Sequence, residues 1–495
     1  MRRYKFAPQP SLFVKPIGEI EFDVFSRHEL LPILMALQYL YVNEHDRLME
    51  ILEEIERDLN SGSDSNQGAS GMTCWETLIL ASLRLGSNLD YDQLADLATN
   101  HRKIQEILGY CELDQKRFAR STVNDNINLL KAETLDRILS IFLDLAHEHC
   151  FGPLDRVRAD TFVAKKNIHY PTDTNMLYDG TRKIIEISLK ISDKFDLPGW
   201  RKHEYNRCKI KGIQQEISKV ARSRAADRDE RLKGLYVRII EAAAVISSKA
   251  EETLALLRAK TKAEKRELEE YWEGWVSELH YYIAGTEYVS RLAERRMLEG
   301  EKIPNPEKVF SLFEPDTELI NRGKTPNPIE FGHRVLVVQD NAGFIIYCQM
   351  LDIGFTDEKI IAEVMRNLQK RFNDRIKAVS FDKGFWTPNN LIDLDELFDL
   401  VVLPKKGKLS KEDKKRQGDK EYKKVRKWHS GIESAIGALV FANGLGKCRD
   451  KGQDGYRRFL AMAVLGRNLQ TFGNILVERE RQRRREENPL LDLAA

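Results

Sequence analysis

At 495 residues the chain is longer than a single hydrophobic core usually grows, so its length predicts two to four domains, or one domain with large insertions. With 42% hydrophobic and 32% charged residues, the composition excludes a disordered or fibrous protein. The formal net charge of +2 indicates no particular partner, although a near-neutral total can conceal local basic surfaces that bind phosphate.

The six cysteines are scattered without any Cys-x-x-Cys spacing, which supports neither a zinc ribbon nor a disulfide framework and favours a reducing compartment. The basic residues at the start of the sequence are followed by no apolar region of signal-peptide type. No later segment is long and apolar enough to span a bilayer. We therefore expect a cytoplasmic protein without a membrane partner.

The first 150 residues have mostly helical periodicity. Apolar residues recur at helical intervals over 29–52, and the Ser/Gly/Asn-rich stretch 60–71 is typical of a flexible linker. Further helices are predicted at 75–85, 92–98, 104–108, 121–130 and 133–147, with Ser121 and Thr122 as N-terminal caps of the fourth.

The predicted helix 121–130 follows a basic loop. Lys116, Arg117 and Arg120 precede it, and Asn124 is the first of several amides along it. A compact set of helices with this arrangement is compatible with a helix-turn-helix DNA reader. The alternative is a plain helical bundle with solvated amides, and composition does not separate the two.

The segment 154–180 contains the first candidate for catalysis. A short apolar strand at 157–159 is predicted to end in Asp160, and a polar turn with Lys165, Lys166 and His169 follows. A carboxylate at a strand end beside basic groups is typical of a metal-dependent site that acts on phosphate. An aspartate in this position is also a common turn former or helix cap.

A long helical region follows. The stretch 176–191 is amphipathic, and 205–300 has almost continuous helical propensity with no proline. We expect this region to be an insertion that folds back as a hairpin or pairs with another chain.

After two prolines at 304 and 306 the periodicity changes to that of strands. Strands are predicted at 310–312, 333–340, 343–352, 376–381 and 399–403, with a hairpin turn at 340–343 and helices at 359–372 and 389–398. The strand 376–381 is followed directly by Asp382. A lysine-rich run at 405–427 is either a solvated loop or, because it lies next to a candidate site, a segment that contacts phosphates. It leads to a helix at 430–440 with Glu433 in its first turn, and the last helix is predicted at 459–476.

Three carboxylates therefore occupy comparable positions: Asp160, Asp382 and Glu433. If the two strands are neighbours in one mixed sheet and the helix packs across it, these oxygens converge and suit two Mg²⁺ or Mn²⁺ ions for an in-line displacement at phosphorus. Each also has an ordinary explanation, because Asp382 precedes Lys-Gly in a typical turn and Ser430 with Glu433 matches a capping box.

The residues around these carboxylates resemble bacterial insertion-sequence transposases of the DDE class, in the ISNCY-type group. The resemblance covers most of residues 70–475. The matching motifs are Ala159-Asp160-Thr161 with Asn167-Ile168-His169-Tyr170-Pro171-Thr172-Asp173, Phe381-Asp382-Lys383-Gly384-Phe385, Pro404-Lys405-Lys406-Gly407-Lys408, His429-Ser430-Gly431-Ile432-Glu433-Ser434, the run 444–452 and the run 463–469.

This resemblance implies an α/β fold with large all-α parts, in which a ribonuclease-H-like mixed-sheet core is interrupted by the helical insertion. The implied organisation is an N-terminal helical segment and linker (1–70), a helical DNA-binding region (71–150), the first part of the core (151–200), the insertion (201–305), the second part of the core (306–475) and a charged C-terminal tail (476–495).

The implied activity is cleavage of DNA at transposon ends and strand transfer into target DNA, with Asp160, Asp382 and Glu433 as catalytic residues that hold two Mg²⁺ or Mn²⁺ ions. A homo-oligomer is expected, with a dimer favoured because two ends must be held, in a bacterial cytoplasm and at the nucleoid when bound to DNA. Weaker candidates for DNA contact are Lys116, Arg117, Arg120, Asn124, Lys165, Lys166, Lys405, Lys406, Lys408, Arg426, Lys427 and His429.

The sequence departs from some related transposases, which place Tyr and Arg before the glutamate and Lys after it. Here His429 lies four residues before Glu433 and Val440 lies seven after it. Two alternatives to a transposase stay open: a nuclease with the same core but no strand transfer, and a non-catalytic DNA-binding protein derived from a transposase.

Overall fold

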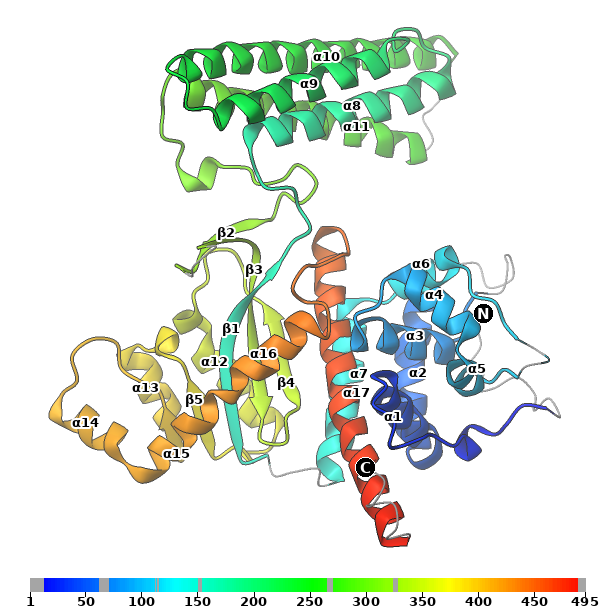
Figure 1. The fold of residues 1–495 in the computed structure, drawn as a ribbon, viewed down its shortest axis with the longest axis vertical. Coiled ribbons are helices and arrows are strands. Elements are labelled where there is room, and N and C mark those ends of the chain that lie inside the picture. Colours follow the sequence, from blue (N-terminus) through cyan, green and yellow to red (C-terminus); the bar gives the residue numbers. More distant parts are fainter. Residues whose placement is uncertain are drawn as a thin grey trace. The chain divides into compact units, whose positions relative to one another are not determined.

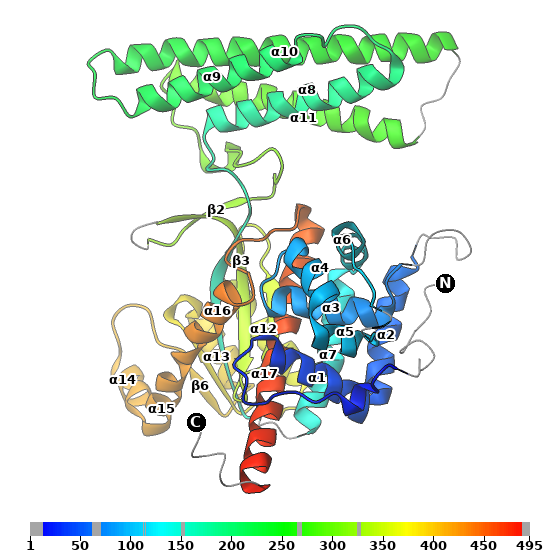
Figure 2. The same cartoon turned by 45° about the vertical axis from the view of Figure 1, so that its right-hand side comes forward.

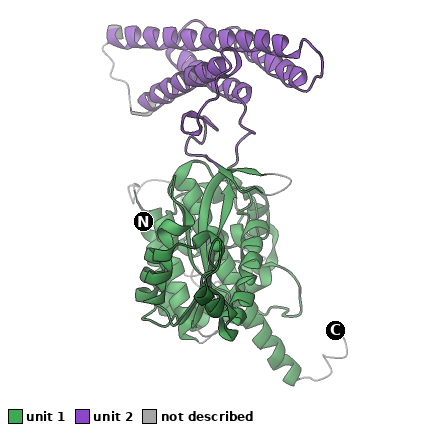
Figure 3. Ribbon diagram, turned by 90° about the vertical axis from the view of Figure 1, so that its left-hand side faces the viewer, with its two compact units in different colours: residues 1–166, 320–495 green, residues 167–319 purple. Residues whose placement is uncertain are grey.

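The computed structural model describes residues 13–61, 71–111, 113, 115–149, 154–264, 270–323 and 328–487. The chain forms two compact units (Figure 3), one from residues 1–166 and 320–495 and the other from residues 167–319. Most of the predicted linker 60–71 lies outside the described residues.

The N-terminal part of the first unit is helical. The predicted helix 29–52 divides in two, because Glu44 leaves the helical region with φ −130° and ψ 49°. The short helices 75–147 are confirmed within two residues at each end, but Ala119 rather than Ser121 or Thr122 is the N-cap of the fourth. The helices are α1 (Leu30–Asn43), α2 (His45–Leu59), α3 (Cys74–Gly86), α4 (Tyr91–Asn100), α5 (Arg102–Leu108), α6 (Arg120–Asn128) and α7 (Ala132–Glu148).

A mixed sheet of six strands forms the other half of this unit (Figure 1). Its order is β2-β3-β1-β5-β6, and β4 also pairs with β3. Strands β3 and β1 are antiparallel, as are β3 and β4, whereas β5 is parallel to both β1 and β6. The strands are β1 (Arg156–Lys165), β2 (Glu318–Asn321), β3 (Ile329–Asp340), β4 (Ile345–Met350), β5 (Ala378–Phe381) and β6 (Leu400–Val402).

Two strand predictions are wrong, and one turn is confirmed. Asp160 lies in the middle of β1 and does not end it, because β1 continues to Lys165 in register with β3. The segment 310–312 forms bends and no strand. The hairpin turn is closed by the Asp340 amide, which donates to the Phe344 carbonyl at 3.0 Å, and Gly343 adopts φ +97° there.

Helices flank the sheet and join it to the N-terminal helices. The lysine-rich run 405–427, predicted as a loop, is mostly helical, and the last helix continues to Glu487 through part of the predicted charged tail. Helix α17 packs against α1, α3, α7 and β4, so it lies between the sheet and the N-terminal helices (Figures 1 and 2). The helices are α12 (Asp357–Arg371), α13 (Pro388–Asp395), α14 (Lys411–Gly418), α15 (Lys420–His429), α16 (Gly431–Phe441) and α17 (Gly452–Glu487).

Close packing of α17 depends on two glycines. A Cβ atom at Gly466 would lie 2.6 Å from the backbone nitrogen of Gly86, and a Cβ atom at Gly473 would lie 1.8 Å from the carbonyl oxygen of Pro32. The backbones of α17 and its neighbours therefore touch where a side chain has no room.

The second unit is a four-helix arrangement with its own hydrophobic core. Thr172 caps α8 by accepting a hydrogen bond from the Asn175 amide at 3.2 Å, and α8 packs against α9, α10 and α11. The insertion therefore folds back on itself, and it includes α8, which we had predicted to belong to the core segment 151–200. The helices are α8 (Asp173–Phe195), α9 (His203–Ala221), α10 (Arg228–Glu264) and α11 (Glu270–Met297).

The contact between α3 and α17 makes a prediction. Gly466→Ala should lower the free energy of unfolding by about 1–3 kcal/mol, because the added methyl group overlaps the Gly86 backbone. The control is Gly437→Ala in α16, where a Cβ atom would meet nothing within 4 Å. That change should instead stabilise by about 0.5–1 kcal/mol through helix propensity. Urea denaturation of both variants checks this, and equal effects would contradict the close approach.

Candidate active site

The parallel pairing of β1 with β5 brings two of the predicted carboxylates together. Ala159 pairs with Phe381, so Asp160 is the next residue of β1 and Asp382 is the residue directly after β5. Paired residues of parallel strands project from the same face of a sheet. The two aspartates, which are distant in sequence, are therefore neighbours at one edge of the β1–β5 contact.

The environment of Asp160 disfavours its charged form. Burial is the largest cause, and together with the negative charges of Asp382 and Asp357 it raises the pKa of Asp160 to about 6. The Thr161 amide donates to Asp160 Oδ1 at 2.7 Å and acts in the opposite direction, as does the charge of Arg322. Asp160 thus sits beside other carboxylates without full compensation by a cation.

Asp382 is exposed and is held by Arg426 of α15. The Arg426 guanidinium donates from Nη1 to the Phe381 carbonyl oxygen at 2.9 Å, and its Nη2 lies 3.3 Å from Asp382 Oδ1. Lys406 donates to the Gly384 carbonyl at 2.9 Å and so ties the turn that follows Asp382. Arg426, predicted as a phosphate contact, instead positions a carboxylate here.

Glu433 occupies the first turn of α16, which packs against β1 and β3. The start of this helix is anchored by Arg158, which lies two residues before Asp160 and so on the same face of β1. Arg158 donates from Nη1 to the Trp428 carbonyl at 2.6 Å, and its guanidinium lies 4.6 Å from the centroid of the Trp428 ring. It also bonds the side-chain oxygen of Gln339.

The backbone at Gly431 passes directly over Arg158. A Cβ atom at Gly431 would lie 2.1 Å from Arg158 Nη1, so a side chain there would displace the guanidinium. The strand that carries Asp160 therefore also fixes the beginning of the helix that carries Glu433. Sequence reasoning missed Arg158, and its only signal was its alternation with Asp160 along the strand.

The structure contains no capping box between Ser430 and Glu433. Ser430 adopts helical angles, φ −55° and ψ −23°, and makes no side-chain cap bond. Its hydroxyl donates instead to the Lys427 carbonyl at 2.8 Å. Glu433 is exposed and is not used to close the helix.

Asp357 is a further carboxylate that sequence reasoning missed. It lies in the first turn of α12, accepts a hydrogen bond from Thr161 Oγ1 at 3.1 Å and lies 3.8 Å from Arg334. Its charge contributes to the raised pKa of Asp160. An acid in a first helical turn is common on electrostatic grounds alone, so the sequence offered nothing to distinguish it.

The donor set suits a hard divalent cation. Asp160, Asp382 and Glu433 supply only carboxylate oxygens, the ligands that Mg²⁺ and Mn²⁺ prefer, and Mg²⁺ commonly takes one or two protein carboxylates and keeps several waters. Among the described residues, no three His, Cys, Asp or Glu side chains form a group close enough to hold a metal ion as they stand. A cation beside Asp160 and Asp382 would remove the electrostatic cost that raises the pKa of Asp160.

The predicted DNA contacts of the helical region are mainly surface residues. Arg117 is exposed, and Arg120 is exposed with its Nε 3.2 Å from Asp92. Lys116 lies 2.6 Å from the buried Glu76, and Asn124 is hydrogen-bonded to its neighbours on α6. Arg117 and Arg120 thus have the accessible charge that phosphate binding needs.

Two predicted phosphate contacts in the sheet unit require correction. Lys166 is only 4% exposed and His429 only 6%, so neither presents a surface to a phosphate. Burial, and then the charge of Arg426, lowers the pKa of His429 to about 4. Of the others, Lys165 and Lys405 are paired with Glu330 and Asp413. The remaining predicted contacts are exposed: Lys406, Lys408 and Lys427.

Comparisons with protein-family models, with curated proteins and with solved structures find no match to this chain. Within the described part of the chain, no helix is long and apolar enough to cross a membrane.

The raised pKa of Asp160 predicts a pH-dependent stability. The pKa of this carboxyl group is about 6 in the folded state and 3.8 at its ordinary value, so the folded state binds the proton more tightly. Ionisation of Asp160 therefore lowers the free energy of unfolding as pH rises between these two values, and the whole loss is present above the higher one. At pH 7.5 in EDTA, Asp160→Asn should therefore have a free energy of unfolding on the order of 1–3 kcal/mol higher than that of the parent, as measured by urea denaturation.

The advantage of Asp160→Asn should disappear at about pH 3, below both pKa values, where the carboxyl group is mostly protonated in the folded and in the unfolded state. Asp352→Asn, which changes an exposed carboxylate outside the site, is the matched control. A gain that is the same at both pH values would show that the asparagine acts through packing and not through charge.

Proposed function

We propose that this protein is a DNA transposase of the DDE class, which binds transposon ends, cleaves their phosphodiester bonds and transfers the freed strands to target DNA. The observation that carries the proposal is the β1–β5 register, in which Asp160 of β1 is next to Asp382, the residue directly after the parallel strand β5. The packing of α16 on β1, with the exposed Glu433 in its first turn, supports the third position.

The same proposal includes a ribonuclease-H-like core. The order β4-β3-β1-β5-β6, with antiparallel neighbours around β3 and parallel neighbours from β1 onward, supports it. The interruption of this core after β1 by a separately packed helical unit, 167–319, agrees with the insertion expected from the resemblance, although its bounds differ from the predicted 201–305.

Asp160, Asp382 and Glu433 would hold two Mg²⁺ or Mn²⁺ ions, which supply activation of the attacking oxygen and stabilisation of the leaving one. The chain itself positions the ligands: Arg426 holds Asp382, and Arg158 holds the start of the Glu433 helix. In the first reaction a water oxygen forms a bond to phosphorus and the 3′-oxygen leaves. In the second, that 3′-hydroxyl oxygen forms a bond to a phosphorus of the target, the bond from this phosphorus to the target's own 3′-oxygen breaks, and the target 3′-oxygen leaves and takes up a proton.

DNA is thus the proposed partner, as both element ends and target, and a homodimer would hold two ends together. The proposed location is the bacterial cytoplasm, with the protein at the nucleoid when bound. A nuclease without strand transfer would use the same three carboxylates for the first reaction, with water as the attacking group, and would not perform the second. The presence of all three carboxylates disfavours a non-catalytic derivative.

Substitution of each carboxylate tests the proposal. Asp160→Asn, Asp382→Asn and Glu433→Gln should each reduce Mg²⁺-dependent cleavage of DNA that carries the element's ends by about 10³-fold or more, because each would remove a metal ligand. DNA binding should be largely retained. Gel analysis of end-labelled DNA measures cleavage, and Glu396→Gln is the control at an exposed acid.

Cleavage that survives any one of the three substitutions would remove that residue from the mechanism. Joining of the cleaved 3′ end to a second, unlabelled plasmid separates a transposase from a nuclease. Cleavage without any joined product would favour the nuclease.

A further inference from the structure

Helix α9, in the separately packed unit 167–319, has an unusual charge balance. The segment 201–224, which contains α9 and its flanks, has eight Lys and Arg residues and two acids. By contrast, α8 has equal numbers of acidic and basic residues, and α11 is acidic overall. Helix α10 has eight basic and six acidic residues, so the excess of positive charge in the segment 201–224 is larger than that of α8, α10 or α11.

The cations of α9 lie away from its buried face. Ile210, Ile213, Ile217 and Val220 form the buried row at helical spacing. The basic side chains outside this row are exposed to solvent: Arg207, Lys209, Lys211, Lys219, Arg222 and Arg224. Packing of the bundle therefore does not require these charges.

Most of these charges also lack acidic partners. Arg207 pairs with Glu204 at 2.8 Å, but within the described part of the chain Lys209, Lys211, Lys219 and Arg222 have no acidic side chain at ion-pair distance. Cations on the neighbouring helix α8 are matched instead, for example Lys183 and Lys190 with Glu186. An unmatched row of like charges destabilises a helix unless an anion is bound to it.

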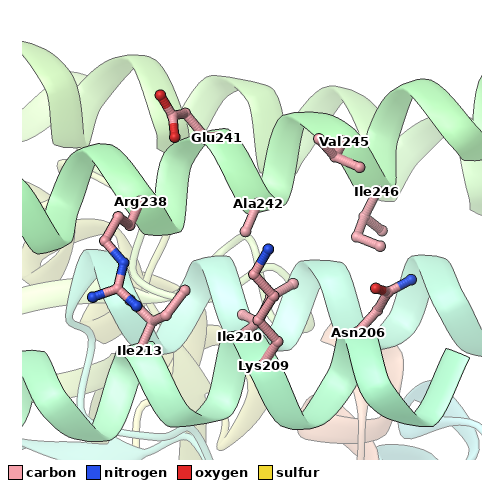
Figure 4. A pocket seen from close by; sticks show the side chains of 9 residues that line it. All are labelled: Asn206, Lys209, Ile210, Ile213, Arg238, Glu241, Ala242, Val245 and Ile246. Carbon is pink, nitrogen blue, oxygen red and sulfur yellow. The ribbon is translucent and has the colours of Figure 1, made fainter. Parts of the chain in front are cut away.

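A cavity of about 230 Å³ between α9 and α10 borders this surface (Figure 4). Lys209 reaches toward α10 and Arg238 toward α9, but Arg238 lies 3.6 Å from Glu216 and Glu241 lines the same cavity. The cavity is therefore close to neutral. The unmatched charge lies on the outward face of α9, at Lys211, Lys219 and Arg222, which we name the α9 basic face.

We infer that the α9 basic face is a second DNA-binding surface, separate from the candidate active site, that contacts the phosphate backbone without reading sequence. The α9 basic face runs from Lys211 to Arg222, which is roughly 16 Å along the helix axis and matches about five base pairs of duplex. Lysines and arginines at helical spacing suit phosphates spaced along a strand, and Gln215 is the exposed amide that lies between Lys211 and Lys219 on this face. The choice of duplex DNA among polyanions rests on the proposed function. The positive charge of the surface follows from the structure alone.

The test compares the full-length protein with the triple variant Lys211→Gln, Lys219→Gln and Arg222→Gln. Binding to a labelled duplex of random sequence is measured by fluorescence anisotropy over a series of salt concentrations. Three lost phosphate contacts should reduce the slope of log affinity against log salt by about 2.7, because each contact contributes about 0.9.

The matched control is Arg182→Gln, Lys190→Gln and Arg291→Gln, which removes the same charge from α8 and α11 of the same bundle. It should change the slope by much less than the α9 variant. Equal slopes for the two triple variants would overturn the inference, since they would show an effect of net charge alone. Circular dichroism of both variants verifies that the helices are retained.

Cys208 provides a second readout in the unaltered protein, because its side chain is exposed on α9. Saturating duplex should slow its alkylation by a maleimide several-fold, as measured by peptide mass spectrometry. Unchanged alkylation would contradict DNA binding at this face. Stronger binding to phosphatidylserine vesicles than to the duplex at equal salt would also overturn the assignment to DNA.

Cleavage of end-containing DNA by the same preparations distinguishes this inference from the proposed function. An α9 variant with unchanged salt dependence, in a chain that cleaves, refutes only the α9 surface. A reduced slope in a chain that does not cleave supports the surface and refutes the transposase.

Discussion

The arrangement of the candidate site depends on the contact between Arg158 and the junction of α15 with α16. One guanidinium bonds the Trp428 carbonyl, stacks near the Trp428 ring and lies against Gly431. An arginine is suited to this because its planar group offers several donors in fixed directions. Since Arg158 shares a strand face with Asp160, this contact sets where the Glu433 helix begins relative to the two aspartates.

Asp160 and Asp382 have different electrostatic environments. Asp160 is penalised by burial and by neighbouring acids, and its pKa is raised to about 6. Asp382 is exposed and lies next to the Arg426 guanidinium. Such unequal environments are frequent at functional sites, although structural ion pairs also produce them. The uncompensated charge at Asp160 is the property that a bound cation would relieve.

The helical insertion is a structurally separate part of the chain. Its four helices bury their own apolar cluster, which lets residues 167–319 pack without help from the sheet. The chain enters the insertion after β1 and returns to the sheet through β2 and β3. The strand β1, which holds Asp160, therefore still pairs with β3 and β5. An insertion of this kind adds surface, and on α9 that surface is cationic.

Local pattern in the sequence determined most of the elements of this protein. Helical periodicity identified α3 to α7 and α12 within two residues at each end, and the strand β5 followed by Asp382 was also predicted correctly, because these features depend on neighbours in the chain. The predicted helix 459–476 covers only the middle of α17. Patterns that depend on distant partners were predicted less well. Asp160 was placed at a strand end because the pairing that extends β1 to Lys165 comes from β3, more than 160 residues away.

Only the tertiary structure decided which side chains meet. The alternation along β1 says that Arg158 and Asp160 share a face, but not that Arg426 and Gly431 lie over that face. Burial likewise removed Lys166 and His429 from the predicted phosphate contacts, since exposure depends on what packs on top. The chemical type of the three carboxylates was readable from the sequence, whereas their neighbourhood required the sheet register, which no local pattern encodes.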